Sequence, residues 1–232
     1  MKFCLDLSHH RWARSDDPKS AADDTLRIAR IADQAAIDSL WLSEDPDGWD
    51  AFSVLSAVAT QTERLRLGTG VTNPYLRHPN LIAMSLATLD RLSGGRAFLG
   101  LGRGQPEWYQ HALGMRIGSP LAALDETIDL LHQWWRPEHA ASISGHFEIR
   151  DWHRSVSPVQ STIPIYLAAL GPKALALAIR RADGLLIADF ASLTYLRQTI
   201  PRLREQLERQ GRDPDAFDIY LRANLRVTDD PE

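Results

Sequence analysis

Short apolar runs alternate with longer amphipathic stretches along the whole chain. The runs are rich in Leu, Ile, Val and Ala, which is typical of strands buried on both faces of a parallel sheet. The longer stretches repeat apolar residues every three to four positions, as amphipathic helices do. The predicted strands are 2–7, 39–42, 65–71, 97–101, 163–169, 184–188 and 217–227. The predicted helices are 20–36, 51–61, 80–92, 106–113, 120–135, 173–181 and 193–210.

Regular alternation of strands and helices predicts an α/β fold built on a parallel sheet. Seven strands are legible before the sequence reaches Glu232, which predicts a (β/α)8 TIM-type barrel lacking its last βα unit. A doubly wound open sheet is the alternative, since it needs no missing unit. The segment 142–152 alternates and turns at Ser144-Gly145, which predicts a small hairpin insertion before the fifth strand. We therefore expect residues 1–232 to form a single barrel domain, incomplete at its carboxyl end.

Two glycine-rich loops follow neighbouring predicted strands. The first contains Gly68-Thr69-Gly70, and the second is the GLGRG segment 100–104. Glycine has no Cβ and lets backbone N–H groups approach a ligand closely. Two bare loops at adjacent strand ends favour a ligand that lies across both, whereas tight βα turns alone are the alternative.

Composition limits the classes of partner. The net charge is −4 with 24% charged residues and no basic stripe, so nucleic acid is not expected as a partner. Cys4 is the only cysteine, which excludes an internal disulfide and suits a reducing compartment. The first residues lack the apolar core of a signal peptide, and no apolar run reaches the roughly 18 residues of a membrane span. We expect a cytoplasmic protein that handles a small molecule and contacts no membrane.

Several polar residues fall at predicted strand ends. Glu44 and Asp45 are adjacent after the second strand and are the catalytic candidates, because a carboxylate there can orient substrate or relay a proton. Capping of the following helix is their alternative role. His9, His10 and His78 are expected to be solvated loop histidines. No spacing of His, Cys and carboxylates resembles a metal site, so no metal is expected.

Aromatic and basic side chains on the same loops have two possible roles. Trp49 and Trp108 could wall a planar ring, whereas Trp134-Trp135 ends a helix and indicates packing or an interface. Arg103 could bind a phosphate or carboxylate, or be an exposed charge.

In this order along the chain, the motifs resemble the bacterial luciferase-like family of flavin- and deazaflavin-dependent oxidoreductases. More narrowly, they are similar to its methylenetetrahydromethanopterin reductase-like branch. The matching segments are LWLSED (40–45), LRLGTGVTNPYLRHP (65–79), LSGGR (92–96), LGLGRG (99–104), IYLAALGPK (165–173) and RADG (181–184).

The resemblance implies hydride transfer between a cofactor and a small organic substrate. It implies the deazaflavin coenzyme F-420 (F420 below), with FMN as the alternative, and a possible homodimer. An FMN-dependent monooxygenase and a non-catalytic or inactive barrel fragment are the competing functions. The cofactor-binding residues carried over are Gly70, Val71, Thr72, Gly102, Arg103, Gly104, Ala168, Ala169, Leu170 and Gly171.

Two local features follow from the same resemblance. It implies a cis Gly70–Val71 peptide that supports the ring, and a phosphate near the helix opened by Gly171-Pro172. Other deazaflavin members place an Asp-His pair after the second strand. This chain has Glu44-Asp45 there, and Gln105 where some members have an acid, so the acid–base residues are not carried over.

Overall fold

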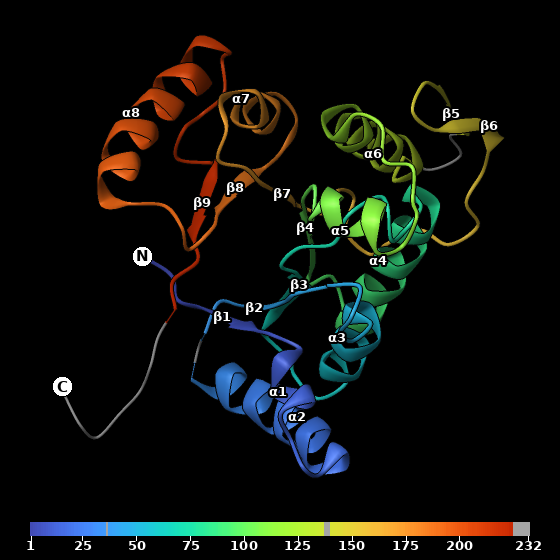
Figure 1. The fold of residues 1–232 in the computed structure, drawn as a ribbon, viewed down its shortest axis with the longest axis vertical. Helices are drawn as coiled ribbons and strands as arrows, with labels where there is room; N and C mark the ends of the chain where they lie inside the picture. Colours follow the sequence, from blue (N-terminus) through green and yellow to red (C-terminus); the bar gives the residue numbers. More distant parts are fainter. Residues whose placement is uncertain (36, 137–139, 225–232) are drawn as a thin grey trace.

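A computed structural model describes residues 1–35, 37–136 and 140–224. Its main feature is a seven-stranded parallel sheet whose strands follow chain order, β1-β2-β3-β4-β7-β8-β9. The strands are β1 (Cys4–Leu7), β2 (Ser39–Leu42), β3 (Arg66–Thr69), β4 (Ala97–Leu101), β7 (Ile165–Ala168), β8 (Gly184–Ile187) and β9 (Asp218–Leu221). The sheet is curled, with the helices along its outer side (Figure 1).

The helices occupy the connections between the strands. They are α1 (His10–Ala13), α2 (Pro18–Gln34), α3 (Ala51–Ala59), α4 (Pro79–Ser93), α5 (Pro106–His111), α6 (Pro120–Trp134), α7 (Pro172–Arg181) and α8 (Leu193–Arg209). Five of them begin with a proline, whose missing N–H and fixed φ suit a first helical turn. No helix in the described ranges is both long and apolar enough to cross a membrane.

The strand order decides between the two predicted architectures. A doubly wound sheet reverses its order at a switch point, whereas this order never reverses, so the open-sheet alternative is wrong. The structure confirms an α/β fold with a curled parallel sheet. Within the described ranges, β1 pairs only with β2 and β9 only with β8. Arg222, just after β9, reaches back to β1, where its Nε lies 3.0 Å from Asp6 Oδ2.

Other expectations differ in detail. The segment 142–152 contains an antiparallel pair, β5 (Ala141–Ser144) and β6 (Glu148–Trp152), which lies beside α6. Residues 10–13, expected as loop, form the short helix α1. Residue 36 of the first expected helix and residues 225–227 of the last expected strand lie outside the described residues.

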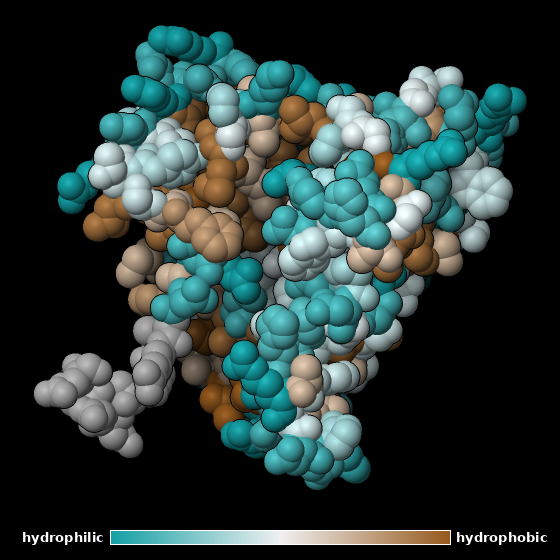
Figure 2. All heavy atoms as spheres, in the orientation of Figure 1, coloured by the Kyte–Doolittle hydropathy of each residue, from teal (hydrophilic) through white to brown (hydrophobic). Residues whose placement is uncertain are grey.

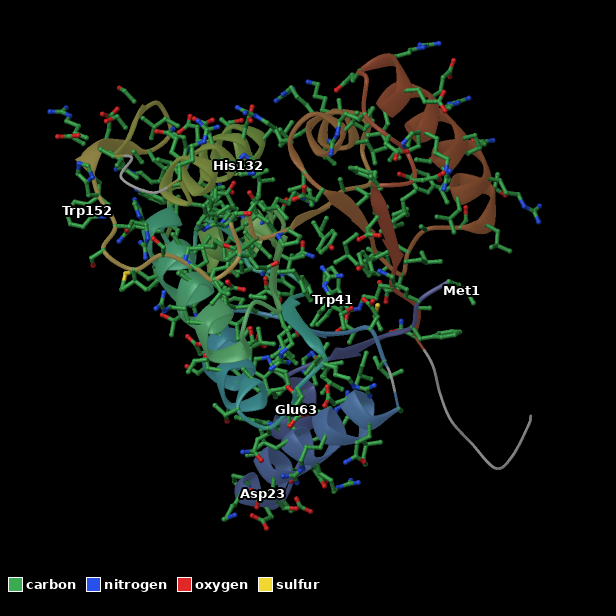
Figure 3. The ribbon with its side chains drawn as sticks, turned by 180° about the vertical axis from the view of Figure 1, so that it is seen from behind. Met1, Asp23, Trp41, Glu63, His132 and Trp152 are labelled. Atoms are coloured by element: carbon green, nitrogen blue, oxygen red, sulfur yellow. The ribbon has the colours of Figure 1, made fainter. Side chains whose placement is uncertain are left out.

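Side chains along the strands alternate between two cores. Leu40, Leu67, Leu99 and Leu185 point outward into a large apolar layer shared with the helices. The opposite face carries a second cluster, here called the inner cluster, and Trp41, one of its members, lies near the middle of the molecule (Figure 3). The inner cluster consists of Trp41, Phe98, Tyr166 and Leu186, with Val71, Ala168 and Tyr220 packed against it.

Glycines on the inner face make room for these rings. A Cβ on Gly68 would lie 2.4 Å from the Phe98 ring. A Cβ on Gly100 would lie 1.9 Å from the Thr69 carbonyl oxygen and 3.1 Å from the Trp41 ring. The distances of 2.4 and 1.9 Å are far below van der Waals contact, and 3.1 Å is tighter than usual. Gly68 and Gly100, which the glycine-rich loops suggested as ligand contacts, therefore serve the packing of the sheet.

Polar side chains lie at the end of the inner cluster that is nearest the start of β3. Arg66, at the start of β3, donates from Nη2 to the Tyr166 hydroxyl (2.6 Å) and from Nη1 to the Tyr220 hydroxyl (3.2 Å). The Tyr166 hydroxyl in turn donates to Asp218 Oδ2 at 3.1 Å. The guanidinium group also lies over the Phe98 ring, with its carbon 5.3 Å from the ring centroid. Arg66 is only partly buried, and its Nη1 also lies 3.6 Å from Asp38 Oδ2, so the guanidinium has carboxylate as well as hydroxyl partners.

Gly100→Ala tests this packing. We expect it to lower the free energy of unfolding by about 3 kcal/mol or more, because the new methyl group meets backbone and an aromatic ring at once. Gly171→Ala is the matched control, since nothing lies within 4 Å of a Cβ there and its φ is −78°. Urea denaturation of both variants makes the measurement; equal stability of the two would contradict this account of the inner face.

Candidate active site at the carboxyl ends of the strands

The carboxyl ends of parallel strands meet at one rim of the sheet, and small residues line it. A Cβ on Gly102 would lie 2.7 Å from Val71 Cγ2 and 3.3 Å from Ala168 Cβ, so these three residues are immediate neighbours. Val71 and Ala168 rest on the inner cluster. The Gly70–Val71 peptide bond is cis, as the resemblance implied. Val71 and Ala168 are half-buried and Gly102 is buried, and this group of three is called here the small-residue floor.

The other predicted cofactor residues surround this floor unequally. Arg103 is an exposed charge, and Gly104 has φ +59° with Tyr109 against it. Leu170 and Gly171 are exposed after β7, whereas Ala169 is buried. Thr72 is also buried, and its hydroxyl donates to Glu44 Oε2. The structure thus places these residues along one rim, and their roles toward a ligand stay predictions.

Glu44 is buried and held by several donors. Arg77 donates from Nε to both carboxylate oxygens at 2.9 Å, and its Nη2 lies 2.7 Å from Oε1. The backbone N–H of Ala51, the first residue of α3, also donates to Oε1 at 3.3 Å. Side-chain exposure is 6% for Glu44 and 10% for Arg77. These contacts favour the capping and positioning role for Glu44; its catalytic role stays a prediction.

Arg77 also joins the loops after β2 and β3. Its Nη2 contacts Asp50, the N-cap residue of α3, and its guanidinium carbon lies 5.0 Å from the Phe52 ring centroid. The pKa of Asp50 is lowered, because the Ser53 N–H and Arg77 outweigh its partial burial. Sequence reasoning missed Arg77, since its partner Glu44 lies 33 positions away and no local pattern links them.

Asp6 is the second residue that sequence reasoning missed. It lies on the inner face of β1, in register with Trp41, and a Cβ on Gly70 would be 3.9 Å from its Oδ2. Burial raises its pKa to about 6, although Arg222 opposes the shift. Its Oδ1 is buried and has no hydrogen-bond partner among the described residues. The alternation in 4–7 was the available signal: Leu5 and Leu7 face the helices, so Asp6 must face inward.

Asp45 and His9 form a contact across two loops. Asp45 Oδ2 lies 3.6 Å from His9 Nδ1, and Asp47 Oδ1 lies 3.6 Å from His9 Nε2. Burial raises the pKa of Asp45, while His9 opposes the rise. The prediction that His9 is solvated is wrong: its side chain is only 5% exposed. The ring is enclosed by α1 and the loop after β2, which no sequence pattern brings together. His10 and His78 are exposed, as predicted.

The tryptophans separate into buried and exposed groups. Trp49 is buried, donates to the Ser43 carbonyl at 2.7 Å and packs edge-on against Trp12, so it does not wall the rim. Trp108 is half exposed on α5. Trp134 and Trp135 are buried in the outer core, which confirms the packing interpretation.

Exposed apolar side chains follow the last strands of the sheet. They are Leu170 after β7, Phe190 and Leu193 after β8, and Leu221 at the end of β9. Figure 2 shows apolar side chains in the furrow between the regions of α8 and α5. Phe190 is 83% exposed, the largest exposed fraction among these four side chains. Within the described ranges, no cluster of three His, Cys or carboxylate side chains is placed to hold a metal ion.

Arg77→Ala should destabilise the fold strongly. Removing the guanidinium leaves Glu44 as an unpaired buried carboxylate, which costs about 3–5 kcal/mol. The double variant Glu44→Gln, Arg77→Met should recover a large part of this loss, because no charge is then stranded. Guanidinium denaturation of the three proteins makes the comparison. If the single variant were as stable as the unaltered protein, Arg77 would not be the partner that Glu44 requires.

Because of Asp6, the free energy of unfolding should fall as the pH rises from 4 to 6. Its pKa is about 6 in the folded protein and 3.8 ordinarily, so in this window the folded chain keeps a proton that the unfolded chain has lost. The resulting loss as pH rises is about 3 kcal/mol, and Asp6→Asn removes it. Unfolding free energies at pH 4 and pH 7 test this. A difference between the two proteins that is the same at both pH values would contradict it.

Several known proteins are similar to this chain in sequence. The chain is 31% identical to a 5,10-methylenetetrahydromethanopterin reductase of Methanolobus tindarius, over 90% of this chain and 64% of that protein. It is 32% identical to an F420-dependent glucose-6-phosphate dehydrogenase of Kineococcus radiotolerans, over 98% of this chain and 69% of that protein. The chain therefore spans slightly less than two thirds of the length of the Methanolobus relative.

A solved structure and a family model complete the comparison. The monooxygenase RslO1 from Streptomyces bottropensis superposes with a TM-score of 0.85 at 25% identity, over 95% of this chain and 70% of that chain. Structural neighbours of this kind are TIM barrels. The model of the luciferase-like monooxygenase family matches residues 1–232. The chain belongs to the luciferase-like monooxygenase family.

Proposed function

We propose that this protein is an oxidoreductase that transfers a hydride between the deazaflavin F420 and a small organic substrate. The observation that carries the proposal is the small-residue floor at the rim together with Asp6, a half-buried carboxylate whose Oδ1 has no hydrogen-bond partner among the described residues. F420-dependent relatives with matched sequence over nine tenths or more of this chain support it. A non-catalytic ligand-binding protein is the competing interpretation from another class.

The residues at the rim fit a planar ring. The side chains of Val71 and Ala168 are half-buried and lie against the buried Gly102, so a flat group would rest on Val71 and Ala168. Asp6 Oδ1 lacks a partner among the described residues and can accept or donate a hydrogen bond. When bound, the deazaflavin supplies the two-electron chemistry, and the protein supplies position and exclusion of water. We propose that Gly70, Arg103, Gly104 and the residues 168–171 complete its binding site.

The acidic residues have different proposed roles. Asp6 is the proton-handling group, because a carboxyl with a pKa of about 6 can exist in both forms near neutral pH. Asp45 is a second candidate, since burial raises its pKa as well. Glu44 acts through Arg77 and Thr72 to fix the loops that flank the floor. Their common effect is to hold a substrate polar group and exclude water at the rim.

We propose that the phosphate of the cofactor binds at the start of α7. Gly171 is an exposed N-cap residue with no side-chain cap, so the first N–H groups of the helix are free to bind an anion. Lys173, in the first turn, is exposed and adds a positive charge.

We also infer the relation of this fold to a complete barrel. The seven parallel strands correspond to seven consecutive units of an eight-unit TIM barrel, with β5 and β6 as an insertion between the fourth and fifth units. The uninterrupted strand order supports this, as do the barrel structures of relatives.

FMN-dependent monooxygenation is the second candidate. It is favoured by the likeness to monooxygenase RslO1, and the small-residue floor accommodates an isoalloxazine as well as a deazaflavin. Both cofactors carry a phosphate group, so the proposed phosphate site at the start of α7 suits either one.

Titration of the purified protein with F420 and with FMN, followed by absorbance and fluorescence, separates these functions. We expect saturable binding of F420, weaker binding of FMN, and substrate-dependent F420 reduction in a screen of alcohols, aldehydes and pterins. Asp6→Asn should bind F420 normally but lose about 100-fold or more in turnover, as expected for loss of a proton-transfer group. Binding of FMN alone, with oxygen consumption, would establish the second candidate. Binding of neither would overturn both.

Lys173→Glu should weaken F420 binding roughly fivefold or more, because a carboxylate at a helix N-terminus repels phosphate. Turnover at saturating cofactor should change little. Lys19→Glu, an exposed charge reversal on α2, is the matched control. An unchanged dissociation constant would place the phosphate elsewhere.

A further inference from the structure

His9 is a buried imidazole with no ordinary hydrogen bond. Its side chain is 5% exposed, and neither ring nitrogen has a hydrogen-bond partner among the described residues. Each nitrogen instead faces one carboxylate at 3.6 Å, Asp45 from Nδ1 and Asp47 from Nε2. A polar ring enclosed in this way is costly unless the facing charges compensate for its lost solvation.

The loop after β2 is shaped around this ring. A Cβ on Gly48 would lie 2.4 Å from His9 Cγ and 2.7 Å from Nδ1, so the loop backbone lies flat against the imidazole. On its other side the ring contacts His10, with centroids 4.3 Å apart. His9 thus fixes the segment that carries Asp45, although it comes from the end of β1.

Asp45 in turn lies among groups from several strand ends. The charged and titratable groups that act on it or respond to it are His9, His10, Asp47, Arg222, Asp6 and Tyr109. They come from the ends of β1, β2 and β9 and from α5. Two loop carboxylates, Asp189 after β8 and Asp45 after β2, act on Asp6 and raise its pKa.

We propose that His9 is a positioning residue that pairs with Asp45 and thereby holds the loop after β2 in place at the carboxyl ends of the strands. The inference rests on the proposed function for its catalytic meaning, but the pairing itself does not require a cofactor. In this arrangement the end of β1 contributes to the site through His9. Gly48 has no Cβ, which lets the loop after β2 pack against the imidazole.

The pairing is tested first without cofactor. Carboxyl ¹³C NMR should follow the titration of Asp45 in the unaltered protein, His9→Asn, Gly48→Ala and His10→Asn. Loss of the imidazole in His9→Asn should move the titration of Asp45 to higher pH, because His9 opposes the effect of burial. Gly48→Ala should act in the same direction by displacing the ring. His10→Asn, the matched control, should cause a smaller change.

Turnover provides the second readout. In protein that reduces F420, His9→Asn should shift the acidic limb of the pH profile of kcat/KM in the direction of the Asp45 shift. It should also lower kcat roughly tenfold or more with little change in cofactor affinity, as expected when a reacting group is misplaced. An Asp45 titration that is identical in folded His9→Asn and unaltered protein would overturn the proposal. A shifted titration in a protein that never reduces F420 would uphold the pairing and refute the proposed function.

Discussion

The fit between glycines and aromatic rings on the inner face of the sheet is the constraint on which the rest depends. Phe98 fills the space above Gly68, and a Cβ on Gly184 would lie 2.7 Å from the Tyr166 ring. Close packing of this kind fixes the relative positions of neighbouring strands, because neither ring can move without opening a void. The same aromatic side chains pack against Val71 and Ala168. The rim therefore rests on packed aromatic side chains.

Charge is distributed unevenly above that floor. Asp6 and Asp45 lie at the β1 and β2 ends, and burial raises the pKa of both. Exposed apolar side chains, Phe190 and Leu193 among them, follow β8. A ligand bound at the rim would meet both environments at once. Asp6 and Glu44 each pair with an arginine, but Glu44 is buried and also accepts hydrogen bonds from Thr72 and Ala51, so it serves the framework.

Sequence pattern was sufficient for the architecture but not for the chemistry. The strand and helix order followed from apolar periodicity and from prolines such as Pro79 and Pro172 at helix starts. The inward orientation of Asp6 could also be predicted from the sequence, because Asp6 alternates with the apolar Leu5 and Leu7. By contrast, the Glu44–Arg77 pair and the enclosure of His9 by Gly48 join distant loops. Their burial is a property of the folded loops, and adjacent residues carry no signal for it. The same limit explains why Glu44 and Asp45, alike in sequence, have different surroundings.

A crystal structure of the protein with F420 tests the central claim most directly. The account predicts the deazaflavin ring against Val71, Gly102 and Ala168, with the Asp6 carboxyl directed toward the ring or the adjoining substrate space. A ring bound away from this floor, or one separated from Asp6 by intervening side chains, would contradict it.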